Sequence, residues 1–285
     1  MSTFYNQLLA DSWKQSLRNK ILWIIGIFIS GISFFMTYDS NSDIVTKLVR
    51  DGEWGAMFSA LFENIPGLIF LIFSFFLLIT LSLISLVSKA ALINGVSLSK
   101  EKKTGFVQNV KFGVSKIVPM LLLEIFLIVP NLIMFVLVLI AVKLNTYSGL
   151  ILTLELLMLI YSLFILLFTH FAYCEITLKN KKPWEALKSA WTLFFKHWKK
   201  TLLVNLLRLV VGVGFWLANA VVLIIVALPF ALLAFISIVV GLAPIALIFL
   251  ILGAVCLFVS LFLVKGFMTT YIYVMMTRLY WSLDR

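Results

Sequence analysis

The segment of residues 201–265 reads TLLVNLLRLVVGVGFWLANAVVLIIVALPFALLAFISIVVGLAPIALIFLILGAVCLFVSLFLVK, and its only charged side chains are Arg208 and the terminal Lys265. A transmembrane helix needs roughly 20 consecutive apolar residues, so this run holds two spans with residues to spare. The apolar side chains follow one another without the alternation that a transmembrane β-barrel strand requires. The segment therefore predicts two long helices within a membrane.

The composition of the whole chain agrees with this segment. Of 285 residues, 63% are hydrophobic and 12% are charged, and the mean hydropathy is +1.13. A soluble domain has roughly 45–50% apolar and about 25% charged residues. Because backbone groups in lipid must be paired within the protein, spans without alternation are helices. We expect an all-α, polytopic transmembrane bundle that forms one domain over residues 1–285.

The apolar runs predict about six spans when each is given the length that a bilayer requires. Their approximate ranges are residues 20–38, 66–96, 115–142, 149–178, 201–228 and 244 to the end of the apolar region. We expect Pro229 to end the fifth helix, and a short outer segment, which could be re-entrant, to lead to the sixth helix at Pro244. The first apolar run lacks a signal-peptide cleavage pattern and is expected to remain as a span.

The distribution of positive charge predicts the orientation. Most of the 23 Lys and Arg residues precede the first span, follow the second or fourth, or lie at the C-terminal end. The opposite side holds only Lys47, Arg50 and Lys143, and its first loop, residues 37–64, is acidic. Loops rich in Lys and Arg stay in the cytoplasm. We expect a multi-pass protein of the cell membrane with both termini in the cytoplasm.

An internal similarity suggests three related units. Residues 88–96, 169–177 and 269–277, at the cytoplasmic ends of the second, fourth and sixth spans, can be aligned with one another, and so can the segments before the first, third and fifth spans. A repeated unit of this kind is a structural unit as well as a sequence unit. The predicted units cover about 4–98, 99–180 and 181–285, and each has an amphipathic cytoplasmic segment followed by a helical hairpin.

The most pronounced amphipathic segment is 181–200. Aromatic and apolar side chains recur there at spacings of three and four residues, and basic side chains occupy much of the remainder. The residues expected at the lipid interface are Trp184, Trp191, Trp198, Lys181, Lys182, Lys188, Lys196, Lys199 and Lys200. A basic helix with such an aromatic face lies in the membrane interface. The segment is either a structural anchor or a surface that attracts anionic lipids, and a membrane protein is a further possible partner.

Several ionisable residues fall within the predicted spans. Glu124 and Arg208 each lie about two turns from the cytoplasmic start of their helices, so we expect them to form an ion pair. His170, Glu175, Lys89 and Lys265 are expected to complete a polar cluster in the cytoplasmic third of the bundle. Such residues are costly in lipid and mark functional sites by default. The cluster is either structural or part of a pathway for a small molecule, a lipid or a proton.

No motif for catalysis or cofactor binding occurs. The chain has no H-E-x-x-H or G-x-S-x-G sequence, no phosphate-binding glycine loop, and no metal-ligand spacing around His170 and Glu175. We therefore expect no enzyme activity, no cofactor, no metal and no nucleic-acid partner. Two functions remain: organising lipids or partner proteins at the cytoplasmic leaflet, or transport of a small molecule or lipid through the polar cluster.

The stretch 171–175, FAYCE, followed by 182–191, KPWEALKSAW, resembles a broad group of uncharacterised prokaryotic six-helix membrane proteins. The end of the chain, 280–285, YWSLDR, is similar to the Tyr-rich end of the last span in that group. The group resembles the membrane domain attached to some glycerophosphoryl diester phosphodiesterases. That resemblance implies a six-helix membrane fold and no catalytic residues here, since the phosphodiesterase chemistry belongs to a soluble domain.

Overall fold

The computed structural model describes residues 2–37, 65–98, 105–143 and 148–284, which are almost entirely helical and include no strand. The predicted acidic loop at 37–64 and the lysines near residue 100 lie almost wholly outside these ranges. The helices are α1 (Ser2–Arg18), α2 (Ile21–Thr37), α5 (Ile65–Leu98), α6 (Phe106–Ser115), α7 (Ile117–Lys143), α8 (Ser148–Lys179), α9 (Pro183–Lys196), α10 (Trp198–Val239) and α11 (Ala243–Asp284).

Five of the described helices, α5, α7, α8, α10 and α11, are long and apolar enough to cross a membrane. The prediction of an all-α, multi-pass membrane protein is confirmed at this level. Helix α2 is apolar as well, with 17 residues. The helices α1, α6 and α9 directly precede α2, α7 and α10 in the sequence.

The predicted break at Pro229 is wrong. Helix α10 runs for 42 residues and includes Pro229, so the segment that was expected to lie outside the span from Pro229 to Ala243 is mostly helix. A proline removes one backbone hydrogen bond, but membrane helices tolerate this loss through local adjustment and neighbouring helices. The turn comes later, at Gly241, whose φ of 81° suits glycine. At 1.5 Å per residue α10 is about 63 Å long, twice the thickness of the apolar core of a bilayer.

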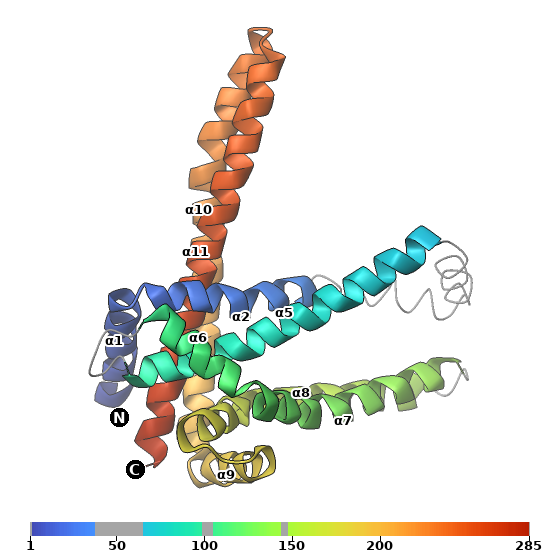
Figure 1. Ribbon diagram of the computed structural model, residues 1–285, viewed down its shortest axis with the longest axis vertical. Coiled ribbons are helices and arrows are strands. Elements are labelled where there is room, and N and C mark those ends of the chain that lie inside the picture. The colour runs from blue at the N-terminus through green and yellow to red at the C-terminus, as the bar shows by residue number, and fades with distance from the viewer. Residues whose placement is uncertain (1, 38–64, 99–104, 144–147, 285) are drawn as a thin grey trace.

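The helices radiate from one packed centre, which we call the hub (Figure 1). Helices α5, α8 and α11 contact one another there, and each carries a short helix: α6 packs on α5, α9 on α8, and α1 on α11. The helices also pack in pairs, α2 with α5, α7 with α8 and α10 with α11, while α2 packs on α11 as well. In Figure 1 the α10–α11 pair points upward, whereas α5, α7 and α8 run to the right.

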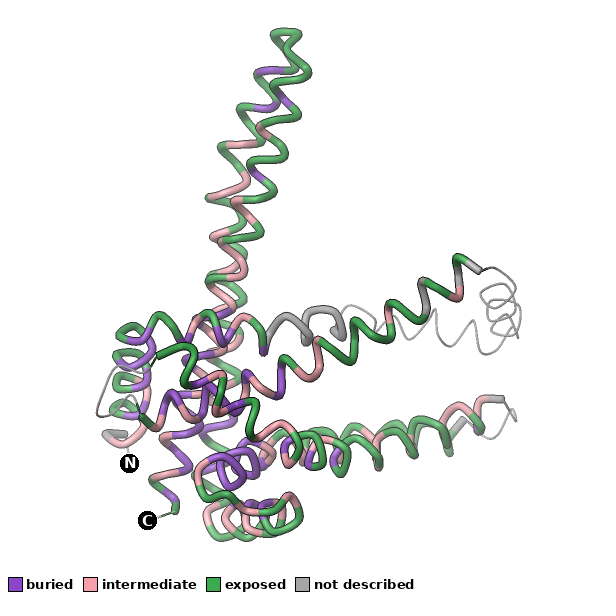
Figure 2. The backbone as a smooth tube through the Cα atoms, in the orientation of Figure 1, coloured by how far each residue is buried: buried purple, intermediate pink, exposed green. Residues whose placement is uncertain are grey.

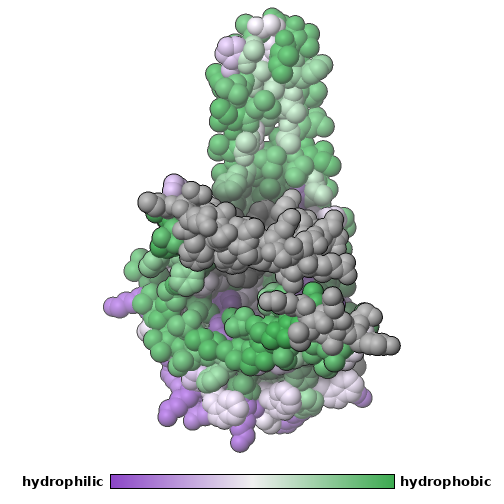
Figure 3. All heavy atoms as spheres, turned by 90° about the vertical axis from the view of Figure 1, so that its right-hand side faces the viewer, coloured by the Kyte–Doolittle hydropathy of each residue, from purple (hydrophilic) through white to green (hydrophobic). Residues whose placement is uncertain are grey.

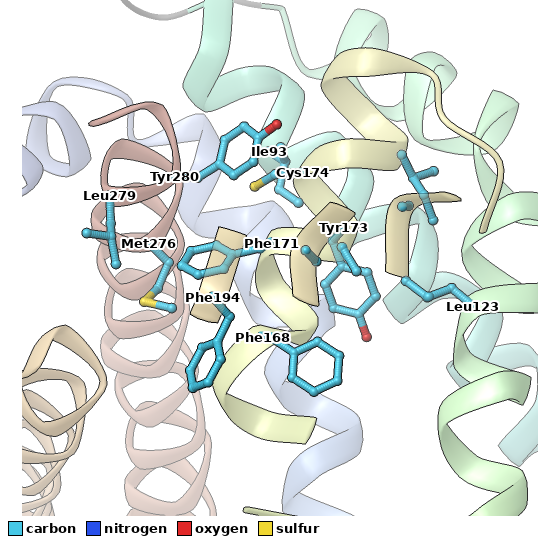
Figure 4. Close-up of a cluster of buried hydrophobic side chains, with 14 of the residues drawn as sticks. Ile93, Leu123, Phe168, Phe171, Tyr173, Cys174, Phe194, Met276, Leu279 and Tyr280 are labelled. Carbon is cyan, nitrogen blue, oxygen red and sulfur yellow. The ribbon is translucent and has the colours of Figure 1, made fainter. Parts of the chain in front are cut away.

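The core of the hub is formed by the three segments that align in the sequence. Ile93 of α5, Phe171 and Cys174 of α8, and Met276 and Tyr280 of α11 are almost completely buried, and Figure 4 shows them side by side with Phe194 of α9. Figure 2 shows that buried residues concentrate in the hub and become sparse along the outer parts of the helices.

Two glycines allow the close crossing of α2 and α11 in the hub. A Cβ atom on Gly26 of α2 would lie 2.5 Å from the carbonyl oxygen of Gly266 of α11, and one on Gly266 would lie 2.5 Å from the carbonyl oxygen of Trp23. The Thr270 hydroxyl donates a hydrogen bond to the carbonyl oxygen of Leu22, 2.9 Å away, across the same crossing. Close backbone approach through small residues is the usual basis of helix packing in membranes.

Outside the hub the helices present apolar side chains. In the most apolar window of each helix, 11% of residues are buried in α7 and α10, 6% in α11 and none in α8. Figure 3 shows the continuous hydrophobic surface of the α10–α11 pair. A soluble protein rarely exposes apolar patches of this extent, so these surfaces are suited to lipid.

Candidate functional site

A charged group within the spans is centred on Lys89 of α5. Its Nζ atom lies 2.6 Å from Oε1 of Glu124 of α7, and both side chains are 20% exposed. The same Nζ atom donates to the hydroxyl oxygen of Tyr173 of α8 at 3.3 Å, and the Tyr173 hydroxyl donates to Oε1 of Glu124. Three helices thus supply one cation, one anion and one hydroxyl, which we call the Lys89 cluster.

The predicted ion pair between Glu124 and Arg208 is therefore wrong, because Glu124 pairs with Lys89. Equal depth along two helices says nothing about the direction in which their side chains point, and α7 packs on α5 and α8 rather than closely on α10. Arg208 lies near a different group, since its charge acts on His170 of α8 and Tyr273 of α11.

His170 and Tyr273 are in direct contact, with ring centroids 5.0 Å apart in an edge-on arrangement. The Nε2 atom of His170 lies 3.3 Å from Oγ1 of Thr277. His170 is 7% exposed, and its polar contacts come from α11. This pattern is typical of a histidine that is hydrogen-bonded within a core.

Glu175 forms a third group, near the C-terminal end of α8. Its side chain is 1% exposed, and Nζ of Lys181 lies 2.9 Å from its Oε2 atom. The Ser189 hydroxyl of α9 donates to Oε1 at 3.1 Å, and Nζ of Lys179 lies 3.5 Å from that oxygen. Glu175 therefore holds the end of α8 to α9 and to residues 180–182, which connect the two helices. Asn180, the first residue of this connection, has a φ of 56°.

The six predicted members of the polar cluster make different direct contacts, and Tyr273 lies near both Glu124 and Arg208. Lys89 and Glu124 belong to the Lys89 cluster, His170 and Arg208 lie in a second group, and Glu175 forms a third. Lys265 is half-buried on α11, beside Gly266 at the crossing with α2.

The surface of α9 has a narrow packed face and a wide exposed face. Ala186, Ala190 and Phe194 are buried against the hub at helical spacing. The three tryptophans predicted at the interface remain outside, with Trp184 66%, Trp191 47% and Trp198 50% exposed. Small residues on the packed face let α9 lie close to α8. The partly exposed rings also contact neighbouring helices, since the Trp191 ring centroid lies 5.1 Å from that of Phe164 of α8 and the Trp184 ring centroid lies 6.4 Å from that of Phe126 of α7.

Five of the six lysines predicted at this interface are exposed, and together with the three tryptophans they form what we call the basic interfacial surface: Lys182, Lys188, Lys196, Lys199 and Lys200. Lys181 is the exception, since it is held by Glu175. Nζ of Lys199 lies 5.7 Å from the ring centroid of Trp198. Burial and the adjacent Lys196 and Lys200 lower the pKa of His197, which favours its neutral form.

The chemistry available differs between these places. The basic interfacial surface presents lysine ammonium groups beside tryptophan rings. This combination suits phosphate-bearing headgroups at a membrane surface. The Lys89 cluster offers a self-neutralised pair that remains partly accessible. Figure 3 shows a recess between hydrophobic surfaces in which hydrophilic atoms are visible.

Tyr173 is the member of the Lys89 cluster that sequence reasoning missed. The signal available was its spacing, because Tyr173 lies three residues after His170 and four before Thr177 on one helix face. A buried tyrosine hydroxyl needs a hydrogen-bond partner, which pointed to a polar neighbour without identifying it.

No known protein family matches the chain, and neither a curated protein nor a solved structure matches it. The resemblance to membrane domains of phosphodiesterases stays a prediction.

Proposed function

We propose that this chain is a non-enzymatic protein of the cell membrane that gathers anionic lipids, and membrane proteins associated with them, at the cytoplasmic leaflet. The observation that carries the proposal is the division of α9 into two faces. Packing against the hub uses Ala186, Ala190 and Phe194, while the exposed lysines of the basic interfacial surface and the outer parts of the tryptophan rings stay at the surface.

The physical basis is the combination of aromatic insertion and charge. Tryptophan rings are enriched at the level of the headgroups, where they are apolar on their body and polar at the indole nitrogen. Each lysine near an anionic surface contributes about 1 kcal/mol of attraction. Five exposed lysines on one short segment therefore favour anionic over zwitterionic lipid.

The topology that supports this role has six spans, with α2 as the first and both termini in the cytoplasm. Three units of common origin would place α1, α6 and α9 at one level of the membrane, and their matching contacts with α11, α5 and α8 support this arrangement. A cysteine introduced by Ser2→Cys should react with an impermeant reagent only in opened cells, and Gly149→Cys should react in intact cells. The reverse pattern would invert the topology.

The lipid role is tested by extracting the protein in polymer-bounded membrane discs and analysing their phospholipids. Discs should be enriched in anionic lipid relative to the surrounding membrane. Replacing the five lysines of the basic interfacial surface by glutamine should remove the enrichment, while replacing them by arginine, which keeps the charge, should preserve it. Equal lipid composition for all three proteins would contradict the proposal.

A second candidate function is transport of a small molecule or lipid, and the Lys89 cluster favours it. The pair of Lys89 and Glu124 is partly exposed rather than sealed, with 20% of each side chain exposed. An ionisable group that faces a water-filled space within spans is typical of a transport pathway. A cysteine replacing Tyr173 should then react with small water-soluble thiol reagents, and complete protection from them would exclude the pathway.

A further inference from the structure

Arg208 lies where α10 leaves the hub. Val204 and Asn205, four and three residues earlier on the same helix face, are buried, with 0% and 5% of their surface exposed. Arg208 itself is half-buried. The neighbouring side chains on α10 are at the surface: Leu206, Leu209 and Val210 are 58%, 61% and 64% exposed.

The guanidinium has no anionic partner among the residues that the structure describes. The ion pairs found there join other residues, and the one carboxylate expected for Arg208, that of Glu124, is held by Lys89. The groups on which the Arg208 charge acts, His170 and Tyr273, are not carboxylates. An arginine keeps its proton in proteins, so a charge at this depth requires an anion or water beside it.

A second polar atom without a partner lies one turn earlier. The amide of Asn205 donates through Nδ2 to the carbonyl oxygen of Thr201 at 3.0 Å. Its Oδ1 atom is buried and accepts no hydrogen bond in the described part of the chain. A buried acceptor of this kind is costly unless a donor reaches it.

We infer that Arg208 binds the phosphate group of one phospholipid of the cytoplasmic leaflet, whose acyl chains lie along the exposed apolar side chains of α10. A guanidinium offers two parallel N–H groups that match two phosphate oxygens. Its long side chain can reach from the helix toward the headgroup level.

This site differs from the basic interfacial surface in position and in kind. The surface of α9 attracts lipid through several exposed lysines, whereas Arg208 is a single half-buried cation with a defined neighbourhood. The inference therefore goes beyond the proposed function, and either can fail while the other holds.

The test uses native mass spectrometry of the full-length protein released from detergent micelles after exposure to defined lipids. The wild-type protein should retain one phospholipid more tightly than the rest, and should not retain diacylglycerol, which has the chains without the phosphate. Arg208→Gln should weaken retention of that lipid about tenfold or more, and Arg208→Lys should weaken it less. Arg278→Gln is the matched control, because Arg278 is held by Asp11 and Gln15.

The outcomes separate the sources of the phosphate. Failure of millimolar inorganic phosphate to displace the lipid supports a phospholipid site, whereas binding of phosphate without any lipid retention would overturn it. Equal retention by wild type and Arg208→Gln would also overturn it. If Arg208→Gln fails to fold, Arg208→Lys decides. Retention of the phospholipid by Arg208→Lys at the wild-type level would contradict a phosphate contact. Glutamine replacement of the five lysines of the basic interfacial surface should leave this one lipid in place.

Discussion

Removal of one partner from the pair of Lys89 and Glu124 should destabilise the protein more than removal of both. The atoms Nζ and Oε1 are 2.6 Å apart and each side chain is 20% exposed. With an effective dielectric constant near 20, the attraction at that separation is about 6 kcal/mol. Desolvation of the two groups offsets most of it. We expect a coupling free energy of about 2–4 kcal/mol between the two positions.

The perturbation is a cycle of Lys89→Met, Glu124→Met and the double variant. Each single variant leaves one uncompensated charge beside Tyr173 and should lower the free energy of unfolding by about 2–4 kcal/mol. The double variant should be more stable than either single variant. The free energy of unfolding is measured in mixed micelles by titration with dodecyl sulfate, followed by circular dichroism. Additive effects of the two single variants, with no coupling, would refute the assignment of this pair.

Three further predictions concern the packing of the hub. Gly26→Leu should cost about 1–3 kcal/mol or more of stability, because even a Cβ there would lie 2.5 Å from the carbonyl oxygen of Gly266, and an unchanged thermal midpoint would contradict this crossing. Glu175→Gln should cost about 1–3 kcal/mol and speed tryptic cleavage between α8 and α9, whereas unchanged cleavage would show that the buried carboxylate does not hold this connection. Ala190→Leu should overpack the buried face of α9 and cost about 1–3 kcal/mol, while Thr192→Leu, on its exposed face, should cost little. Equal effects of these two leucine variants would contradict the orientation of α9.

The membrane class and the approximate helix positions could be predicted because hydropathy and helix length are local properties. Helices α7 and α8 begin and end within two residues of the sequence-based ranges. The end of α10 was not predictable in the same way. In water a helix can end at a proline, because water can bind the backbone groups that lose their partners. In lipid the backbone groups must be paired within the protein, so the helix continues past the proline.

The polar groups show what a sequence leaves undetermined. Position along a helix could be read from the residue number, so the shared depth of Glu124 and Arg208 was a sound inference. Which way each helix turns its side chains depends on packing, and glycine crossings such as that of Gly113 against the carbonyl oxygen of Val87 set that packing. Lys89 was expected near a helix end, and the approach of α5 to α7 made it the partner of Glu124.

The exposed face of α9 was predicted from spacing, but its packed face was not. The sequence pattern emphasised the large aromatic residues, whereas the structure packs α9 through Ala186, Ala190 and Phe194. Small residues carry little weight in a hydropathy pattern, although they permit the closest approach of helices. The tryptophans are consequently about half or more exposed and available to the interface, although Trp184 and Trp191 also contact rings of α7 and α8.

The central claim is that α9 prefers anionic lipid at the cytoplasmic leaflet. It is tested most directly by fluorescence quenching in vesicles, with a variant that keeps only Trp184, Trp191 and Trp198 and replaces the other tryptophans by phenylalanine. Brominated anionic lipid should quench this fluorescence more strongly than brominated zwitterionic lipid, and glutamine replacement of the five lysines should abolish the difference. Equal quenching by the two lipids in the protein with intact lysines would contradict the account.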